Sequence, residues 1–387
     1  MTQAEIQDLG AQLMAGEHLL EEQESAVDIE SFVRSLPKAE LHLHLEGAVA
    51  APTAIELARK HGLSAHDYED ASKLFDFPDL GAFLQAYDII CNSIVDSDDF
   101  HRVTYEMLAR CAVNGARYVE FFFSPQAHHG VAYATMLDGI VAAMRDAARD
   151  HGVHSRLIPA LNRELGPEIS MQFLDLVLAH RREEVIGIGL DYNEVGHPPG
   201  LYADVYRRAR NRGLRVTAHA GENGPSEHVG ASLDVLACDR IDHGYHVVDD
   251  PALVAACRER GVFFTVCPTT TTYTTTFRDL ASPGHAIHRM FDAGLNLVIN
   301  TDDPALFRTD LNSEYLLVAR HMGCTPQQLA GVALNGLRAS WLDDTTKRAW
   351  ISEWSAEINR LLPPAASRPL DSHVPATERR TPGKAAH

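Results

Sequence analysis

Four short segments, spread over most of the chain, carry histidine and acidic side chains of the types that bind a zinc ion. Each segment follows a short apolar run that reads as a β-strand, and parallel strands of one sheet bring such segments to the same edge. Their convergence predicts the site of a metal-dependent hydrolase. The segments are His42-Leu43-His44, His219-Ala220-Gly221-Glu222, Asp242-His243-Gly244 and Asn300-Thr301-Asp302-Asp303.

The predicted metal ligands are three histidines and one aspartate. His42 and His44 are two residues apart, and alternate residues of a strand point to the same face. Because the chain has 21 histidines, about one such pair is expected by chance. The pair therefore indicates a metal site only together with further ligands elsewhere in the chain. His219 and Asp302 follow later strands and complete a nitrogen-rich set, which suits one zinc ion per chain and leaves room for a bound water.

These residues also have ordinary structural interpretations. His219 could be a core or surface histidine, but Glu222 three residues later favours a ligand. Asp302 and Asp303 could form a solvated turn or a helix cap before Pro304. Two carboxylates after a buried strand can instead divide the work, with one on the metal and the other on the substrate.

Two further residues could move protons. Zinc lowers the pKa of its water to about 7, which makes hydroxide available at neutral pH. Glu222 could then donate a proton to a ring nitrogen of the substrate as the nucleophile adds. His243 could orient and deprotonate the water or steady the developing charge. Either residue could instead be structural.

Eight apolar runs alternate with amphipathic stretches, which predicts a parallel sheet. Glycines such as Gly152 and Gly261 end the helical stretches just before the next strand. Eight such units close into a (β/α)8 TIM barrel of the metal-dependent hydrolase type, with its chemistry at the C-terminal ends of the strands. No Gly-rich phosphate turn follows the first strand, which disfavours an open doubly wound sheet. The predicted strands are 39–45, 118–123, 155–160, 185–191, 215–220, 240–243, 262–267 and 296–300.

We expect one barrel domain at 35–362, between a polar N-terminal arm or helix at 1–34 and a disordered tail at 363–387. An insert after the first strand, at 51–115, is longer than one crossover helix. Its apolar residues either pack against the barrel, which we favour, or form a lid over the barrel mouth. They are Phe75, Phe77, Leu80, Phe83, Leu84 and Tyr87.

Composition narrows the classes of partner. The formal net charge of -19 opposes binding of nucleic acid and of anionic membranes, so we expect a small neutral substrate. No apolar run approaches the ~20 residues that span a bilayer, and no secretory signal is visible, so we expect a cytoplasmic protein. Six dispersed cysteines without a Cys-x-x-Cys pair fit reduced thiols there. One sequence does not predict the oligomeric state.

Together the motifs resemble those of the adenosine deaminase family, zinc-dependent aminohydrolases on a barrel of the amidohydrolase type. The resemblance implies zinc ligation by the four ligands named above. It implies that Glu222 protonates N1 of a 6-aminopurine, that His243 manages the attacking water and that Asp303 contacts N7. Glu46 takes the place of a family acid, more usually aspartate, that contacts the ribose. The resemblance runs from Pro37 to about Trp341 and rests on Lys38-Ala39-Glu40-Leu41-His42-Leu43-His44-Leu45-Glu46-Gly47 and the three later motifs.

Two departures from the family pattern bear on the substrate. The segment Asp191-Tyr192-Asn193-Glu194-Val195-Gly196 replaces a Gly-containing segment that contacts the purine N3, and it is similar to the adenine deaminase branch. Glu194 could accept a hydrogen bond from an N–H of a free base, which a nucleoside lacks at N9. Second, a Thr-rich loop at 269–276 follows Cys267-Pro268, where the family commonly has a small polar pair including Ser-Asn. This loop either seals the rim or reshapes the pocket for a modified adenine.

The expected reaction is hydrolytic deamination of adenine to hypoxanthine and ammonia, with adenosine to inosine a close second and another aminopurine as an alternative. Hydrolysis of a cyclic amide commonly uses a bridged two-metal centre with a modified lysine, for which no motif is present. Deamination of a base within nucleic acid is disfavoured, because the sequence lacks the Pro-Cys-x-x-Cys element of the deaminases that act on polynucleotides. A catalytically silent purine-binding protein would have lost Glu222, His243 or a ligand, and none is substituted.

Overall fold

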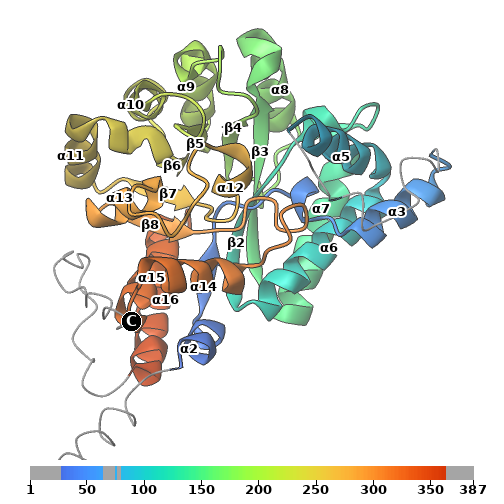
Figure 1. Ribbon diagram of the computed structural model, residues 1–387. Coiled ribbons are helices and arrows are strands. Elements are labelled where there is room, and N and C mark those ends of the chain that lie inside the picture. The colour runs from blue at the N-terminus through green and yellow to red at the C-terminus, as the bar shows by residue number, and fades with distance from the viewer. Residues whose placement is uncertain (1–27, 64–74, 76–79, 363–387) are drawn as a thin grey trace, which may run out of the picture.

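A computed structural model describes residues 28–63, 75 and 80–362, with the backbone alone for 80–85 (Figure 1). Eight parallel strands follow one another in chain order, each hydrogen-bonded to the next. The predicted (β/α)8 barrel is therefore confirmed, with strand ends that differ from the predicted ones by a few residues. The strands are β1 (Lys38–Glu40), β2 (Ala116–Phe123), β3 (His154–Asn162), β4 (Gly187–Asp191), β5 (Arg215–Ala220), β6 (Arg240–His243), β7 (Phe263–Val266) and β8 (Asn296–Ile299).

The residues that follow β1 and β8 pair with each other and join the first strand to the last. The N–H of His44 donates to the carbonyl of Asp302 at 2.8 Å, and the N–H of Asp302 donates to the carbonyl of His42 at 3.1 Å. Regular pairing of β1 stops at Glu40, earlier than predicted, because the next amide, that of Leu41, donates to the side-chain oxygen of Asn300 at 2.7 Å. The two histidines therefore lie on an irregular extension of the strand.

Helices connect the strands and surround the barrel (Figure 1). Helices form between the strands, as the alternation of apolar and amphipathic stretches predicted, and glycines with positive φ, Gly152 and Gly261, end two of them. The helices are α2 (Ile29–Ser35), α3 (Ala51–Lys60), α5 (Leu80–Ser93), α6 (Ser97–Val113), α7 (Tyr133–His151), α8 (Gly166–Ala179), α9 (Ala203–Asn211), α10 (Ser226–Asp234), α11 (Pro251–Arg260), α12 (Thr271–Thr274), α13 (Ala286–Asp292), α14 (Leu311–Met322), α15 (Pro326–Ala339) and α16 (Asp344–Leu361).

The insert after β1 contains α3, α5 and α6. Phe75 is buried, and the hydroxyl of Tyr87 lies near Glu46 and Ser124. Phe77 and the side chains of residues 80–85 lie outside the described residues, so the choice between packing and a lid stays a prediction.

Most of the predicted N-terminal arm and the whole predicted tail, residues 363–387, also lie outside the described residues. Of the arm, the structure describes α2, which begins after Asp28, whose side chain accepts from the amides of Glu30 and Ser31. The single-domain assignment stays a prediction. Within the described ranges, no helix is long and apolar enough to cross a membrane.

A buried ion pair lies in the wall of the barrel. Arg240 on β6 contacts Glu120 on β2, and both side chains are fully buried. The guanidinium also donates to the carbonyl of Leu41 at 3.1 Å and lies 4.2 Å from the ring centroid of Trp341. These contacts hold the charge away from water and link β2 and β6 with the segment that follows β1.

Substitution of Arg240 by methionine should destabilise the fold strongly, because it leaves the Glu120 carboxylate buried without its cation. We expect the free energy of unfolding to fall by about 3–5 kcal/mol. Arg215→Met, which removes an exposed ion pair with Asp239, serves as the control and should cost less than about 1 kcal/mol. Urea unfolding measures both, and equal losses would contradict the prediction.

Candidate active site

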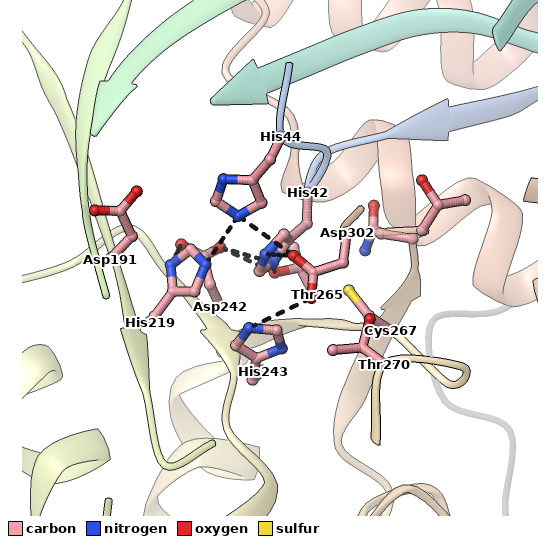
Figure 2. A network of polar contacts seen from close by, with 12 residues as sticks. His42, His44, Asp191, His219, Asp242, His243, Thr265, Cys267, Thr270 and Asp302 are labelled. Atoms are coloured by element: carbon pink, nitrogen blue, oxygen red, sulfur yellow. Dashed lines mark hydrogen bonds and ion pairs between the residues drawn. The ribbon is translucent and has the colours of Figure 1, made fainter. Parts of the chain in front are cut away.

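Four side chains of metal-binding type meet at the mouth of the barrel (Figure 2). Nε2 of His44 lies 3.1 Å from Nε2 of His219 and 3.3 Å from Oδ1 of Asp302. The same aspartate oxygen lies 3.1 Å from Nε2 of His42. All four residues are buried, and their ligand atoms lie within 4.8 Å of one another. The structure thus brings together the four ligands expected from the sequence.

A carboxylate behind these ligands fixes the orientation of His42. Asp242 accepts hydrogen bonds from the hydroxyls of Thr265 at 2.9 Å and Thr217 at 2.7 Å. Nδ1 of His42 lies 2.9 Å from the same Thr265 oxygen. Because the single hydroxyl proton of Thr265 goes to Asp242, Nδ1 of His42 is the donor to Thr265, and Nε2 keeps its lone pair for the cluster. The two threonines were not predicted. Their only signal is a polar residue inside an apolar strand.

Burial and neighbouring charges set the protonation of the cluster. Burial lowers the pKa of His42, and burial together with the adjacent imidazoles lowers the pKa of His219 well below its usual range. Although burial opposes the charged form of His44, the hydrogen bond to Asp302 and the charge of Asp303 raise its pKa to about 10. Against the effect of burial, the nearby imidazoles hold the pKa of Asp302 well below its usual range. The carboxylates therefore favour a positive charge among these ligands.

The donor set and its spacing fit a tetrahedral divalent ion. Ligand atoms about 2.05 Å from such an ion lie about 3.3 Å apart, close to the distances between these atoms. Nε2 of His42 is buried without a hydrogen-bond partner of suitable geometry, as expected of an atom that binds metal. A second possible grouping combines His42 and Asp302 with His243 and Cys267. Burial raises the pKa of the Cys267 thiol well above its usual range, which makes it a poor ligand.

Glu222 and His243 lie beside the ligand cluster. Oε2 of Glu222 is 3.7 Å from Nε2 of His243, and that nitrogen is 4.0 Å from Oδ2 of Asp302. Nδ1 of His243 faces the hydroxyl of Tyr245 at 3.3 Å. That hydroxyl also lies 3.3 Å from the carbonyl of Cys267 and accepts from the amide of Cys267 at 3.0 Å, while Nε2 of His243 faces Glu222. Burial raises the pKa of Glu222 above its usual value. The pair is therefore suited to proton transfer.

Asp303 carries a buried oxygen, Oδ1, without a hydrogen-bond partner. Burial and the charge of Asp302 raise the pKa of Asp303 well above its usual range, which favours the protonated form of its carboxyl. The side chain lies directly on Gly47, where an added Cβ would come within 1.7 Å of Oδ1. Glycine at 47 is therefore required for Asp303 to keep this position.

Glu46 is buried among protein partners. Its Oε1 accepts from the amide of Ser124 at 2.9 Å and lies 2.9 Å from Nε2 of His128. Nδ1 of His128 faces the carbonyl of Cys91 at 3.0 Å and must donate to it. The hydroxyl of Tyr87 lies 3.5 Å from Oε2. Against the effect of burial, the contact with His128 lowers the pKa of Glu46. The carboxylate is thus held in place by the protein.

Glu194 lies against the turn that carries Glu222. Its Oε2 accepts from the amides of Gly221 at 3.2 Å and Gly224 at 2.5 Å and lies 3.6 Å from Nδ1 of His228. The contact with a substrate N–H that we expected from the sequence stays a prediction. The sequence did not suggest the contact with the turn, because these residues are distant along the chain.

Two residues of the site have a left-handed backbone. His243 has φ of 65° and Asp302 has φ of 62°. A residue other than glycine in this region costs about 1–3 kcal/mol and persists only where its surroundings hold it. His243 is the last residue of β6 and Asp302 lies three residues after β8, so at both places the chain turns at the end of a strand beside the cluster.

Comparisons with known proteins agree with this geometry. The family model described as adenosine deaminase matches residues 37–356. An adenine deaminase from Acinetobacter baylyi is 34% identical over 325 residues, which cover 83% of this chain and 97% of that protein. An adenine deaminase from Streptomyces coelicolor is 38% identical over 336 residues, 86% of this chain and 97% of that protein.

Solved structures show the same similarity. An amidohydrolase from Burkholderia ambifaria with bound zinc is 38% identical, with a TM-score of 0.81, and covers 86% of this chain and 93% of that one. An adenine deaminase from Arthrobacter aurescens is 34% identical, with a TM-score of 0.78, and the match covers 83% of this chain and 98% of that one.

Removal of the Thr265 hydroxyl should weaken metal binding although Thr265 is not a ligand. In Thr265→Val, Nδ1 of His42 loses its acceptor, so we expect the affinity for a divalent metal to fall about 10–100-fold. Competition with a chelator, with zinc or cobalt as the probe ion, measures this. Thr265→Ser keeps the hydroxyl and should bind nearly as well as the native protein. A valine variant with unchanged affinity would show that the contact does not orient the ligand.

Proposed function

The chain belongs to the adenosine deaminase family, and we propose that it removes the 6-amino group of free adenine by hydrolysis, giving hypoxanthine and ammonia. The observation that carries the proposal is the convergence of three imidazoles and one carboxylate beside an acid, Glu222, and a second histidine, His243. Relatives named adenine deaminase align over nearly their whole length. A small purine is therefore the expected partner, and a cytoplasmic location is part of the proposal.

We propose that His42, His44, His219 and Asp302 hold one zinc ion. The three nitrogen donors and single carboxylate suit zinc better than a harder ion. Zinc in such a set makes water acidic enough to supply hydroxide near neutral pH. The remaining steps need proton donors, acceptors and contacts that the chain itself provides.

Glu222 and His243 provide the proton transfers in this proposal. Hydroxide adds to C6 of the ring while the proton on Glu222 passes to N1, so the carboxylate keeps the electron pair of the broken O–H bond. Nε2 of His243, which faces Glu222, accepts or shares the proton of the attacking water. The amino group then takes up a proton and leaves as ammonia. Water and adenine are consumed, and hypoxanthine and ammonia are formed.

Asp303 and Glu46 support a purine substrate in different ways. The unpaired Oδ1 of Asp303 offers a contact for N7, as the family resemblance implies. A protonated Asp303 can donate to that ring nitrogen, which is an acceptor. Glu46, at the place of the ribose-contacting acid, is instead bound by Ser124 and His128. These two partners satisfy Oε1 of Glu46 when no ribose is present. This arrangement supports a free base as the substrate.

Replacement of Glu222 by glutamine should abolish most turnover without loss of metal. Glutamine has nearly the same shape but no acidic proton, so we expect kcat to fall by about 100-fold or more. Ammonia release and metal content measured on the same sample separate the two effects. Glu227→Gln, an exposed change nearby, is the control. A Glu222→Gln enzyme with near-native turnover would remove Glu222 from the mechanism.

The native protein should prefer adenine to adenosine by about 100-fold in kcat/KM, because a site that hydrogen-bonds a base N–H leaves its own group unpaired with a nucleoside. Ammonia release from adenine, adenosine, deoxyadenosine and N6-substituted adenines measures the preference. Higher turnover of adenosine would reverse the assignment of the substrate. Higher turnover of an N6-substituted base would favour the modified adenine that the Thr-rich loop suggested.

A further inference from the structure

The Thr-rich loop at 269–276 reaches the proposed acid. Its short helix α12 ends at Thr274, whose hydroxyl donates to Oε1 of Glu222 at 2.5 Å. The carbonyl of Thr270 is a second acceptor for this hydroxyl at 3.2 Å, and the shorter contact with the carboxylate is the stronger one. Glu222 follows β5, so this contact joins the loop after β7 to the turn after β5, and Figure 1 shows α12 near the ends of these strands. The loop therefore touches the site and does more than seal its rim.

The loop is fixed by contacts of its own. The Thr271 hydroxyl donates to the carbonyl of Pro268 at 2.6 Å and lies 3.1 Å from Nε2 of His285. The hydroxyl of Thr275 donates to the carbonyl of Thr271 at 2.8 Å. These bonds hold the helical turn independently of Glu222. Thr274 is therefore presented to the carboxyl by an already ordered backbone.

The Tyr273 ring adds a second anchor on the other side of the helix. It stacks on Phe307 with a centroid distance of 4.8 Å and an interplanar angle of 20°. The amide of Phe307 donates to the carbonyl of Asp303 at 3.0 Å. The helix is thus tied to the loop after β8, which carries the residue proposed to contact N7.

The two oxygens of Glu222 have different surroundings. Oε1 accepts the Thr274 hydroxyl, and Oε2 faces Nε2 of His243 at 3.7 Å. An oxygen that accepts a hydroxyl proton is a poor place for the acid's own proton, because the two hydrogens would face each other. The proton of the neutral acid is therefore directed to Oε2, on the side of the reacting groups.

We propose that Thr274 is a positioning residue that fixes which oxygen of Glu222 carries the proton and holds that oxygen toward the substrate. The inference rests on the proposed role of Glu222 as the proton donor. When the Oε2–H bond breaks and the N1–H bond forms, the electron pair stays on the carboxylate. The Thr274 hydroxyl donates to the charged carboxylate more strongly than to the neutral acid. Thr274 thus acts on the chemical step more than on binding.

The test compares three variants in the full-length, metal-loaded enzyme with adenine as substrate. Thr274→Val keeps the shape without the hydroxyl, and we expect kcat to fall about 10–100-fold with KM changed less than about threefold. Thr274→Ser restores the donor and should stay within about threefold of the native kcat. The control is Thr272→Val, because the Thr272 hydroxyl donates to the carbonyl of Thr269 and should leave kcat nearly unchanged.

The pH profile separates positioning from general loosening of the loop. A hydroxyl that donates to a carboxylate favours its charged form, so the loss of this donor raises the pKa of Glu222. Because the protonated acid is the active form, the alkaline limb of kcat should move to higher pH in Thr274→Val and stay in place in Thr272→Val. A valine variant with kcat within about twofold of native and an unmoved limb overturns the proposal, as does a serine variant as slow as the valine variant.

A crystal structure of Thr274→Val distinguishes this proposal from the proposed function. In the present structure the Glu222 carboxylate faces His243, and we expect it to turn away from His243 in the variant. If the native protein released no ammonia from any aminopurine, the proposed function would fail, and the orientation of Glu222 would still decide the role of Thr274. An unchanged carboxylate in the valine variant overturns that role.

Discussion

Three buried imidazoles and one carboxylate constrain the rest of this structure, because their ligand atoms lie within 4.8 Å of one another and three of the pairs are 3.1–3.3 Å apart. Atoms this close in a dry interior need a shared positive charge, because nitrogen lone pairs and carboxylate oxygens repel one another there. The residues behind this cluster help to hold its nitrogen lone pairs in place. Asp242 takes the hydroxyl proton of Thr265, and this choice fixes the tautomer of His42. A residue outside the cluster thus decides which atom of His42 faces the other three side chains.

The parallel barrel makes this crowding possible. The ends of its strands meet in one ring, so residues separated by most of the chain become neighbours without any long loop. The same ring carries Glu222, His243 and Asp303, whose Oδ1 has no hydrogen-bond partner. Lower in the barrel, Arg240 pairs with Glu120, and its Nε lies 3.9 Å from Oδ1 of Asp242, the carboxylate behind His42. The buried ion pair and the cluster are therefore electrostatic neighbours.

Much of the fold and of the ligand set could be predicted from local signals. Apolar runs marked the strands, and the spacing of His42 and His44 marked two of the clustered residues, which follow the first strand. Other features depend on distances across the barrel that no local pattern encodes. The pairing of Glu46 with His128 spans 82 positions, and the contact of Thr274 with Glu222 spans 52. Polar residues of this kind look like ordinary loop residues until the register of the strands is known.

His42, His44 and Asp302 are also joined by backbone hydrogen bonds, in addition to the contacts of their side chains. These residues form the seam at which the barrel's first strand meets its last. An ion held by their side chains would clamp that seam from within, so metal loading and closure of the barrel become a single cooperative event. Amide hydrogens along the seam would then exchange more slowly as the ion binds, so the backbone of the barrel's first and last strands would report on the occupancy of the site.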